Sequence, residues 1–287
     1  MTNVEHMQHA IRLASKGIYT TDPNPSVGCV IVKDGEVVGE GWHQQAGEGH
    51  AEVNALKQAG DKAKDATVFV TLEPCSHTGK TPPCADALVA AGVKRVIAAM
   101  TDPNPLVSGN GLKKLSDAGI DVESGLLEAQ ARALNPGFIK RMESGRPFVR
   151  VKMAMSLDGR TAMASGESKW ISSEASRVDV QHLRAQSSAV LTGIGTVLAD
   201  DPSMNVRLTA EELSIEEESL RQPKRIVLDS QLQMPSKAKI FSVEGGSAGG
   251  ECIVYTAAEA DIGSERPYSV EKIYAQDGKL DLHQVMK

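Results

Sequence analysis

The chain has 287 residues, of which 41% are hydrophobic and 3% aromatic, and its formal net charge is −6 at pH 7. This length is enough for two domains with their own cores, while the acidic balance and the scarcity of aromatic rings count against an enzyme that edits polynucleotides, which would need a basic groove and stacking rings. No eighteen consecutive residues are apolar, and the N-terminus is typical of an amphipathic helix and not of a signal peptide, so we expect a cytoplasmic protein without membrane association.

The first half of the chain alternates predicted helices and strands in the order of an α/β fold. A helix at residues 4–16 precedes strands at 27–33 and 36–41, which the turn Asp34-Gly35 joins into a hairpin. Further elements are expected in the order helix 50–59, strand 66–72, helix 83–91, strand 94–100 and helix 112–118. Thr81 is the expected N-cap of the helix at 83–91.

Three residues in this half have the identity and order of zinc ligands: His50, Cys75 and Cys84. One imidazole and two thiolates leave the fourth tetrahedral position open to water, and zinc in such a site lowers the pKa of that water to about 7. Glu52 follows His50 by two residues, in the predicted first helical turn, where its carboxylate can transfer protons. Together these residues are the set of a zinc-dependent deaminase.

Two other interpretations stay open at this point. The cysteines could be small core residues with His50 on the surface, or the zinc site could be purely structural, although structural sites usually have four protein ligands. The order of His-x-Glu and Pro-Cys, in matching strand and helix contexts, favours catalysis. Cys29 and Cys252 lie inside apolar runs, and we expect both to be buried, inert thiols.

The tetrapeptide Asp-Pro-Asn-Pro occurs twice, at residues 22–25 and 102–105, once before a predicted strand and once after one. The simplest explanation is a rigid turn. A turn at a strand end also presents an asparagine amide, Asn24 or Asn104, where a polar heterocycle could be held. The residues alone do not decide between the two.

A second pattern begins at residue 145. We expect a strand at 148–154, the segment SLDGRT at 156–161, a run at 184–192, a short helix from Gly193-Ile194-Gly195-Thr196 to about residue 200, and strands at 225–229 and 252–256. The glycine-rich turn could seat a phosphate, but it lacks the third glycine of the dinucleotide fingerprint, so a tight packing turn explains it equally well. The acidic run at 211–218 is most simply a solvated helix face.

Four segments together carry a family resemblance that covers essentially the whole chain. They are DPNPSVGCVIVKDG, HAEVNAL, TLEPCSHTGKTPPC and KMAMSLDGRTAMASGESKWIS, in this order. The chain resembles the bifunctional riboflavin-biosynthesis enzymes that join a pyrimidine deaminase to a pyrimidine reductase. The resemblance implies a cytidine-deaminase-like three-layer α/β/α domain at 1–144 and an incomplete dihydrofolate-reductase-like α/β domain at 145–287. It also implies zinc and NADPH as cofactors and a homo-oligomer.

The implied reactions begin with hydrolytic removal of the 2-amino group of 2,5-diamino-6-(5-phosphoribosylamino)pyrimidin-4-one. NADPH then reduces the ribosyl group to ribityl. Carried over by position, the zinc ligands are His50, Cys75 and Cys84, the proton carrier is Glu52, and the deaminase substrate contacts are Asn24, His43, Lys80 and Asn104, with Lys80 at the phosphate. In the second domain the cofactor positions are Ala154, Trp170, Thr196, Asp200 and Ser230, and the substrate positions are Lys152, Ser168, Arg184, Met204 and Arg207.

The C-terminal residues 279–287 depart from the family pattern, since they are typical of an amphipathic helix that has just begun. In the family this helix is followed by a strand, a glutamate-glycine-rich cofactor loop and the last strands of the sheet. We therefore expect either a piece of a longer product or a second domain that no longer reduces its substrate. The chain should then release ammonia without oxidising NADPH.

Three functions remain as hypotheses: the riboflavin-pathway deaminase, a base deaminase acting on RNA or free nucleosides, and a non-catalytic zinc-bearing domain. The eight residues between Cys75 and Cys84, in place of two, and the acidic balance favour the first over the second. Glu52 favours the first over the third, because a structural zinc ion has no use for an unligated carboxylate beside it.

Overall fold

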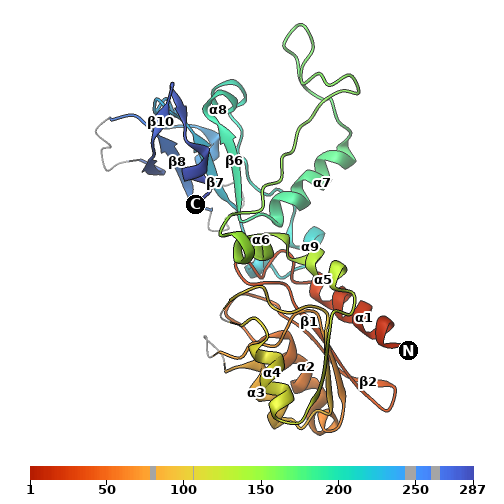
Figure 1. Cartoon of the computed structure of the whole chain (residues 1–287). Helices are drawn as coiled ribbons and strands as arrows, with labels where there is room; N and C mark the ends of the chain where they lie inside the picture. Colours follow the sequence, from red (N-terminus) through yellow and green to blue (C-terminus); the bar gives the residue numbers. More distant parts are fainter. Residues whose placement is uncertain (78–81, 106, 243–249, 260–265) are drawn as a thin grey trace. The chain divides into compact units, whose positions relative to one another are not determined.

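The computed structural model describes residues 1–77, 82–105, 107–242, 250–259 and 266–287 (Figure 1). These residues form two compact units, Met1–Phe148 and Val149–Lys287, each with its own sheet. The units are described separately below.

The first unit is built on a five-stranded sheet in the order β2-β1-β3-β4-β5. Its strands are β1 (Gly28–Lys33), β2 (Glu36–Trp42), β3 (Thr67–Val70), β4 (Arg95–Ala98) and β5 (Asp121–Ser124). The first two form the predicted hairpin, β1 pairs with β3 in antiparallel orientation, and β3, β4 and β5 run parallel. The parallel strands therefore end at one edge of the sheet, where sites of open α/β sheets gather.

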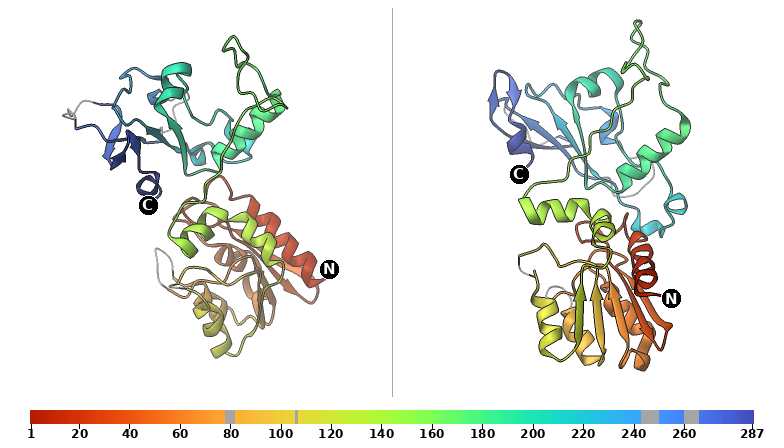
Figure 2. Two further views of the ribbon diagram at one scale, coloured as in Figure 1. Left: turned by 45° about the horizontal axis from the view of Figure 1, so that its top comes forward. Right: turned by 45° about the vertical axis from the view of Figure 1, so that its right-hand side comes forward.

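Helices cover both faces of this sheet, which makes the three-layer arrangement expected from the sequence (Figure 2). One face packs against α2 (Ala51–Ala59), α3 (Cys84–Ala90) and α4 (Asn110–Asp117), and the other against α1 (Asn3–Ser15), α5 (Glu128–Leu134) and α6 (Pro136–Ser144). Because side chains alternate along a strand, Val68 and Val70 enter the first core and Phe69 the second. The 3₁₀ helix η1 (Gly60–Ala63) follows α2.

Helix α2 approaches the hairpin so closely that the strand beneath it requires glycine. A Cβ atom on Gly41 would lie 2.4 Å from the Ala51 carbonyl oxygen, and one on Gly39 would lie 2.4 Å from that of Ala55. The buried residues that the helix contributes to this core are Ala51, Ala55 and Ala59, and Leu56 packs against it half-buried. The backbone of β2 thus fixes the position of the helix that begins next to His50.

The second unit contains a four-stranded parallel sheet in the order β6-β7-β8-β9. Its strands are β6 (Ala189–Gly193), β7 (Lys224–Leu228), β8 (Cys252–Thr256) and β9 (Ser269–Lys272), and a separate hairpin pairs β10 (Ala275–Gln276) with β11 (Lys279–Leu280). The helical segments are α7 (Glu174–Ala185), α8 (Ile194–Asp200), α9 (Ala210–Leu213), η2 (Glu217–Ser219), η3 (Lys239–Phe241) and α10 (Leu282–Val285). Its core includes Val197, Val227, Ile240 and Val254.

The strand predicted at 148–154 is wrong, because the structure has neither strand nor helix between α6 and α7 (Figure 1). The alternating apolar residues that led to the prediction are exposed, Val151 by 79% and Met153 by 62%. A strand forms only where a neighbour pairs with its backbone N–H and C=O groups, and within the described residues no strand pairs with this segment.

Three smaller predictions also need correction. The N-cap of α3 is Pro83 and not Thr81, which lies outside the described residues. The expected acidic helix face at 211–218 is divided between the single turn α9 and the 3₁₀ helix η2, with Ser214 in the left-handed conformation between them. At the C-terminus, Lys279 and Leu280 form a strand, so the helix is confined to Leu282–Val285.

Candidate active site

The three predicted zinc ligands come together in the first unit. His50 is the N-cap of α2, Cys75 follows β3, and Cys84 is the first residue of α3. The Nδ1 atom of His50 lies 3.2 Å from the Sγ of Cys84 and 3.6 Å from the Sγ of Cys75, and the ligand atoms all lie within 4.8 Å of one another. Nitrogen and sulfur ligands of one tetrahedral zinc ion lie roughly 3.5 Å apart, so the three donors fit zinc.

Cys75 is held by the N-terminus of α3. Its Sγ accepts a hydrogen bond from the backbone N–H of Cys84 at 3.3 Å, and its carbonyl oxygen accepts one from Ala85 at 3.1 Å. Hydrogen bonds from the Cys84 thiol, from His50 and from this backbone N–H lower the pKa of Cys75, and the hydrogen bond with Cys75 raises the pKa of Cys84. These contacts favour the thiolate form of Cys75, which is the form that binds zinc.

Glu52 lies in the first turn of α2 and is only 3% exposed. Burial raises the pKa of its carboxyl group to about 7, and hydrogen bonds to the group and the charge of His50 oppose this shift. The carboxylate is within hydrogen-bonding reach of the Cys84 thiol, yet it is not one of the three residues whose atoms surround the metal position. A group with this pKa can accept and donate protons at neutral pH.

His43 and Asn24 form a network beside His50. The Nδ1 of His43 lies 3.1 Å from the carbonyl oxygen of Gly49, which can only accept, so Nδ1 carries the proton. The Nε2 of His43 then accepts from the Asn24 amide nitrogen at 3.1 Å. The ring of His43 also contacts the ring of His50 edge to face, with centroids 5.5 Å apart.

Asn54 belongs to the same network and was missed by the sequence analysis. Its amide nitrogen donates to the carbonyl oxygens of Trp42 at 2.9 Å and Gly49 at 3.3 Å, which ties the end of β2 to the residue before His50. Its place in the middle of a predicted helix could have identified it. An asparagine side chain there competes for the backbone hydrogen bonds of the helix unless it has a partner outside the helix.

The second Asp-Pro-Asn-Pro turn also lies near the cysteines. The backbone N–H of Asn104 donates to the Asp102 carboxylate at 2.8 Å. Burial raises the pKa of Asp102 to about 6, and the negative charges of Glu73 and Cys75 add to this effect. Lys80, the predicted phosphate contact, lies outside the described residues.

In the second unit, Thr196 follows β6 and Ser230 follows β7, so both lie near the carboxyl ends of these neighbouring parallel strands. Asp200 is the last residue of α8, the helix that contains Thr196. Arg184 of α7 donates to the carbonyl oxygen of Asn205 at 3.0 Å. Burial lowers the pKa of Arg184, and so does the charge of Arg207.

Other positions predicted for the second unit lie elsewhere. Lys152, Ala154, Ser168 and Trp170 lie in the connection between α6 and α7, outside the sheet. Trp170 is 72% exposed, and its ring stacks under the guanidinium group of Arg177, 4.3 Å from the ring centroid. The described contacts do not join these four residues to Thr196 or Ser230.

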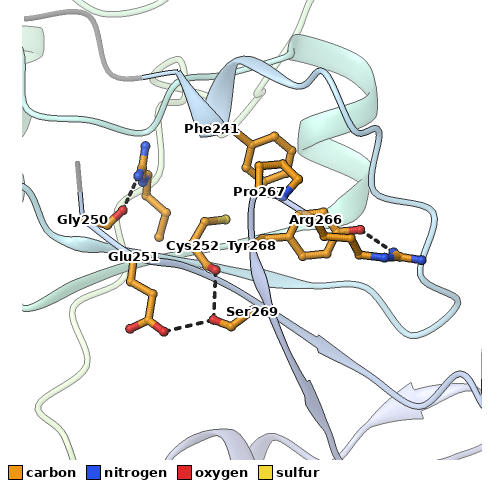
Figure 3. Close-up of a pocket in the computed structure, with 9 residues that line it drawn as sticks. Phe241, Gly250, Glu251, Cys252, Arg266, Pro267, Tyr268 and Ser269 are labelled. Carbon is orange, nitrogen blue, oxygen red and sulfur yellow. Dashed lines mark hydrogen bonds between the residues drawn. The ribbon is translucent and has the colours of Figure 1, made fainter. Parts of the chain in front are cut away.

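A cavity of about 630 Å³ opens at the opposite edge of this sheet (Figure 3). Cys252 and Ser269, which line it, are the first residues of β8 and β9, so it lies at the amino ends of the parallel strands. The rings of Phe241 and Tyr268 stack on its wall, with centroids 5.1 Å apart. None of the predicted site residues lines it.

Comparisons with known proteins agree with this arrangement of two units. Residues 1–100 match the cytidine and deoxycytidylate deaminase zinc-binding region, and residues 147–287 match the RibD C-terminal domain. The riboflavin biosynthesis protein RibD of Escherichia coli K12 is 57% identical over 249 residues, which are 85% of this chain and 68% of that protein. The chain belongs to the RibD family.

Relatives and solved structures give the extent of this relationship. RibD of Haemophilus influenzae is 61% identical over 82% of this chain and 64% of its own length. RibD of Acinetobacter baumannii covers 95% of this chain and 74% of that chain, with 51% identity and a TM-score of 0.85. The match to a deaminase and reductase from Thermotoga maritima covers 99% of this chain and 76% of that chain, with 38% identity and a TM-score of 0.84. The chain spans about two thirds of the length of the curated relatives it matches.

The family resemblance and the fold class predicted from the sequence are therefore confirmed. Family membership makes the chain an enzyme of riboflavin biosynthesis, with a zinc-binding deaminase region followed by a RibD C-terminal reductase domain. In the described part of the chain no helix has the length and hydropathy of a membrane span.

Proposed function

We propose that residues 1–144 form a deaminase domain that hydrolyses 2,5-diamino-6-(5-phosphoribosylamino)pyrimidin-4-one, releasing its 2-amino group as ammonia. The observation that carries this proposal is the set of three ligand atoms within 4.8 Å beside a buried carboxylate that is not a ligand. In our proposal His50, Cys75 and Cys84 hold zinc, and Glu52 is the proton carrier.

The chemistry divides between the metal and this carboxylate. Zinc, when bound, is a Lewis acid that makes water a better nucleophile. Glu52 accepts a proton from the water that attacks the carbon bearing the 2-amino group and gives it to the adjacent ring nitrogen. It then moves the remaining hydroxyl proton to the departing amine. A carboxyl group whose burial raises its pKa to about 7 suits both transfers.

Four other residues are proposed to bind this substrate: Asn24, His43, Lys80 and Asn104. Because Asn24 donates to His43 through its amide nitrogen, its amide oxygen is the atom left to accept from an N–H group of the pyrimidine. The ammonium group of Lys80 suits a phosphomonoester, which it would bind as a point charge. Asn104 lies on the same turn as Asp102, and the negative charge of Cys75 is one of the causes that raise the pKa of Asp102.

For residues 145–287 we propose a domain of the reductase type; in the full-length family this domain uses NADPH to reduce the ribosyl group to ribityl. The proposed cofactor positions are Ala154, Trp170, Thr196, Asp200 and Ser230, and the proposed substrate positions are Lys152, Ser168, Arg184, Met204 and Arg207. The charge of Arg207 lowers the pKa of Arg184, so the two cationic groups are near each other, which supports an anionic substrate. NADPH oxidation with the deaminated product tests this half.

The deaminase proposal is tested with Glu52→Gln. This change keeps the size of the buried side chain but removes its ability to carry a proton, so we expect parental zinc content and turnover reduced by roughly 10²- to 10⁴-fold. Ammonia release from the diaminopyrimidine and bound zinc are both measured. Glu36→Gln, at the exposed first residue of β2, is the matched control and should keep full activity.

Two results contradict the proposal. Near-parental activity of Glu52→Gln shows that another group carries the proton. Ammonia release from cytidine but not from the diaminopyrimidine favours the alternative, a nucleoside or base deaminase.

We further propose a cytoplasmic homo-oligomer. All four cysteines, Cys29, Cys75, Cys84 and Cys252, are free thiols, which supports a reducing compartment. Light scattering of the purified chain measures its oligomeric state.

A further inference from the structure

Glu73 is a buried carboxylate that the proposed reaction does not use. It follows β3, is 3% exposed, and forms no ion pair within the described residues. Within the described residues, both of its carboxyl oxygens accept hydrogen bonds from backbone N–H groups. Such a buried acceptor holds the groups that donate to it, because separating them leaves a buried polar group without partners.

The donors to Glu73 all come from one segment, residues 102–112. The Oε2 atom accepts from Asp102 at 3.0 Å and Gly109 at 2.9 Å, and the Oε1 atom accepts from Gly111 at 2.8 Å and Leu112 at 3.3 Å. The first donor lies two residues before Asn104, and the last two are in the first turn of α4, where the helix dipole favours a negative charge.

A second close contact joins the same two parts of the chain. A Cβ atom on Gly111 would lie 1.9 Å from the carbonyl oxygen of Pro74, so only glycine allows α4 to approach the turn that carries Cys75. Glu73 and Pro74 thus bring the turn of Asn104 against the turn of a zinc ligand.

We propose that Glu73 is a positioning residue of the deaminase, which fixes Asn104 relative to Cys75 through these four hydrogen bonds. The inference rests on the deaminase function proposed above. Glu73 is not among the three residues whose atoms surround the metal position, and it acts through the backbone of residues 102–112.

The test compares Glu73→Gln with Asn104→Ala and with the double variant, all in the 287-residue chain. Glutamine has only one acceptor oxygen, so its amide N–H₂ group must face two backbone N–H donors. Because donors cannot bond to donors, we expect the backbone segment that carries them to shift. We expect stoichiometric zinc, a KM for the diaminopyrimidine raised about 10-fold or more, and a smaller change in kcat. Because both changes act on Asn104, the double variant should lose little beyond Asn104→Ala alone.

A control separates positioning from a general loss of stability. Ile120→Ala removes apolar volume from the same core at the amino end of β5, away from the carboxyl ends of the strands, and should lower the unfolding midpoint without changing KM. An unchanged KM in Glu73→Gln overturns the inference and leaves the proposed function standing. So does a double variant in which the KM effects of Glu73→Gln and Asn104→Ala add fully. A parent chain that releases no ammonia overturns the proposed function and the inference with it.

Discussion

At the scale of single residues, the two candidate cysteine ligands are held by different means. Cys75 lies on a turn and accepts hydrogen bonds from the N-terminus of α3 through both its sulfur and its carbonyl oxygen. Cys84 is part of that helix and is fully buried. Within the described residues these two cysteines and His50 form the one group of potential metal ligands whose atoms all lie within 4.8 Å of one another.

We expect Cys84→Ser to lose both zinc and ammonia release. A serine hydroxyl stays protonated at neutral pH and is a poor replacement for one of only three protein ligands. Zinc content by elemental analysis checks this. Cys252→Ala removes a buried thiol of the second unit and serves as the control, which should keep zinc; stoichiometric zinc in Cys84→Ser would refute the ligand assignment.

The residues proposed for zinc binding were predictable because their chemistry is rare and their spacing is local. His50 and Glu52 are two residues apart, and each cysteine adjoins a predicted element. Glu73 and Asn54 were not predictable in this way. Their partners are backbone groups, and for Glu73 these lie 29 to 39 residues along the chain, where no side-chain pattern marks them.

At the scale of elements, the position of α2 is fixed by contact between backbones. Gly39 and Gly41 of β2 meet the carbonyl oxygens of Ala55 and Ala51. With no side chain between helix and strand that could change its rotamer, the interface has no room for an added methyl group. The start of α2, next to His50, depends on this contact.

Gly41→Ala should therefore destabilise the first unit by about 1–3 kcal/mol, because its Cβ atom would overpack the interface. Urea unfolding of the zinc-loaded protein measures the loss. Gly137→Ala is the matched control: this glycine is in α6 with no atom within 4 Å of an added Cβ, so alanine should be neutral or stabilise by about 0.5–1 kcal/mol. Equal stability of the two variants would contradict the close-contact argument.

The sequence predicted elements well where periodicity and turn residues agreed, as in the hairpin of β1 and β2. In the first unit it missed β5, α5 and α6. β5 is mostly exposed, and each of these helices buries a single residue, Ala131 or Ile139, so their apolar pattern is weak. The prediction of a strand at 148–154 was wrong although the apolar pattern of this segment is clear. A strand also needs a neighbouring strand to pair with, and that neighbour can be far away in the sequence.

At the scale of the whole molecule, each unit buries its own hydrophobic core around its own sheet. All residues proposed for deamination lie at or before Asn104, within the first unit. The proposed halves should then be separable in function, and a change in the second unit should not reach the zinc site.

We expect residues 1–148, produced alone, to fold, bind one zinc ion and release ammonia at a rate within a few-fold of the 287-residue chain. In the 287-residue chain, Arg184→Ala should leave ammonia release unchanged, because its described contacts lie in the second unit. The measurements are zinc content and ammonia release. A fragment that folds with zinc but is inactive would show that the first unit depends on the second.

The pairing of Cys75 with Cys84 has a consequence for redox chemistry. The pKa of Cys75 is lowered and the sulfur of Cys84 lies within 4.8 Å of it, an arrangement that favours oxidation of the metal-free site to a disulfide. Zinc bound by both sulfur atoms would protect them from this reaction. A disulfide would remove two of the three proposed ligands until a reductant restored the thiols, so metal binding and redox state would be linked at this site.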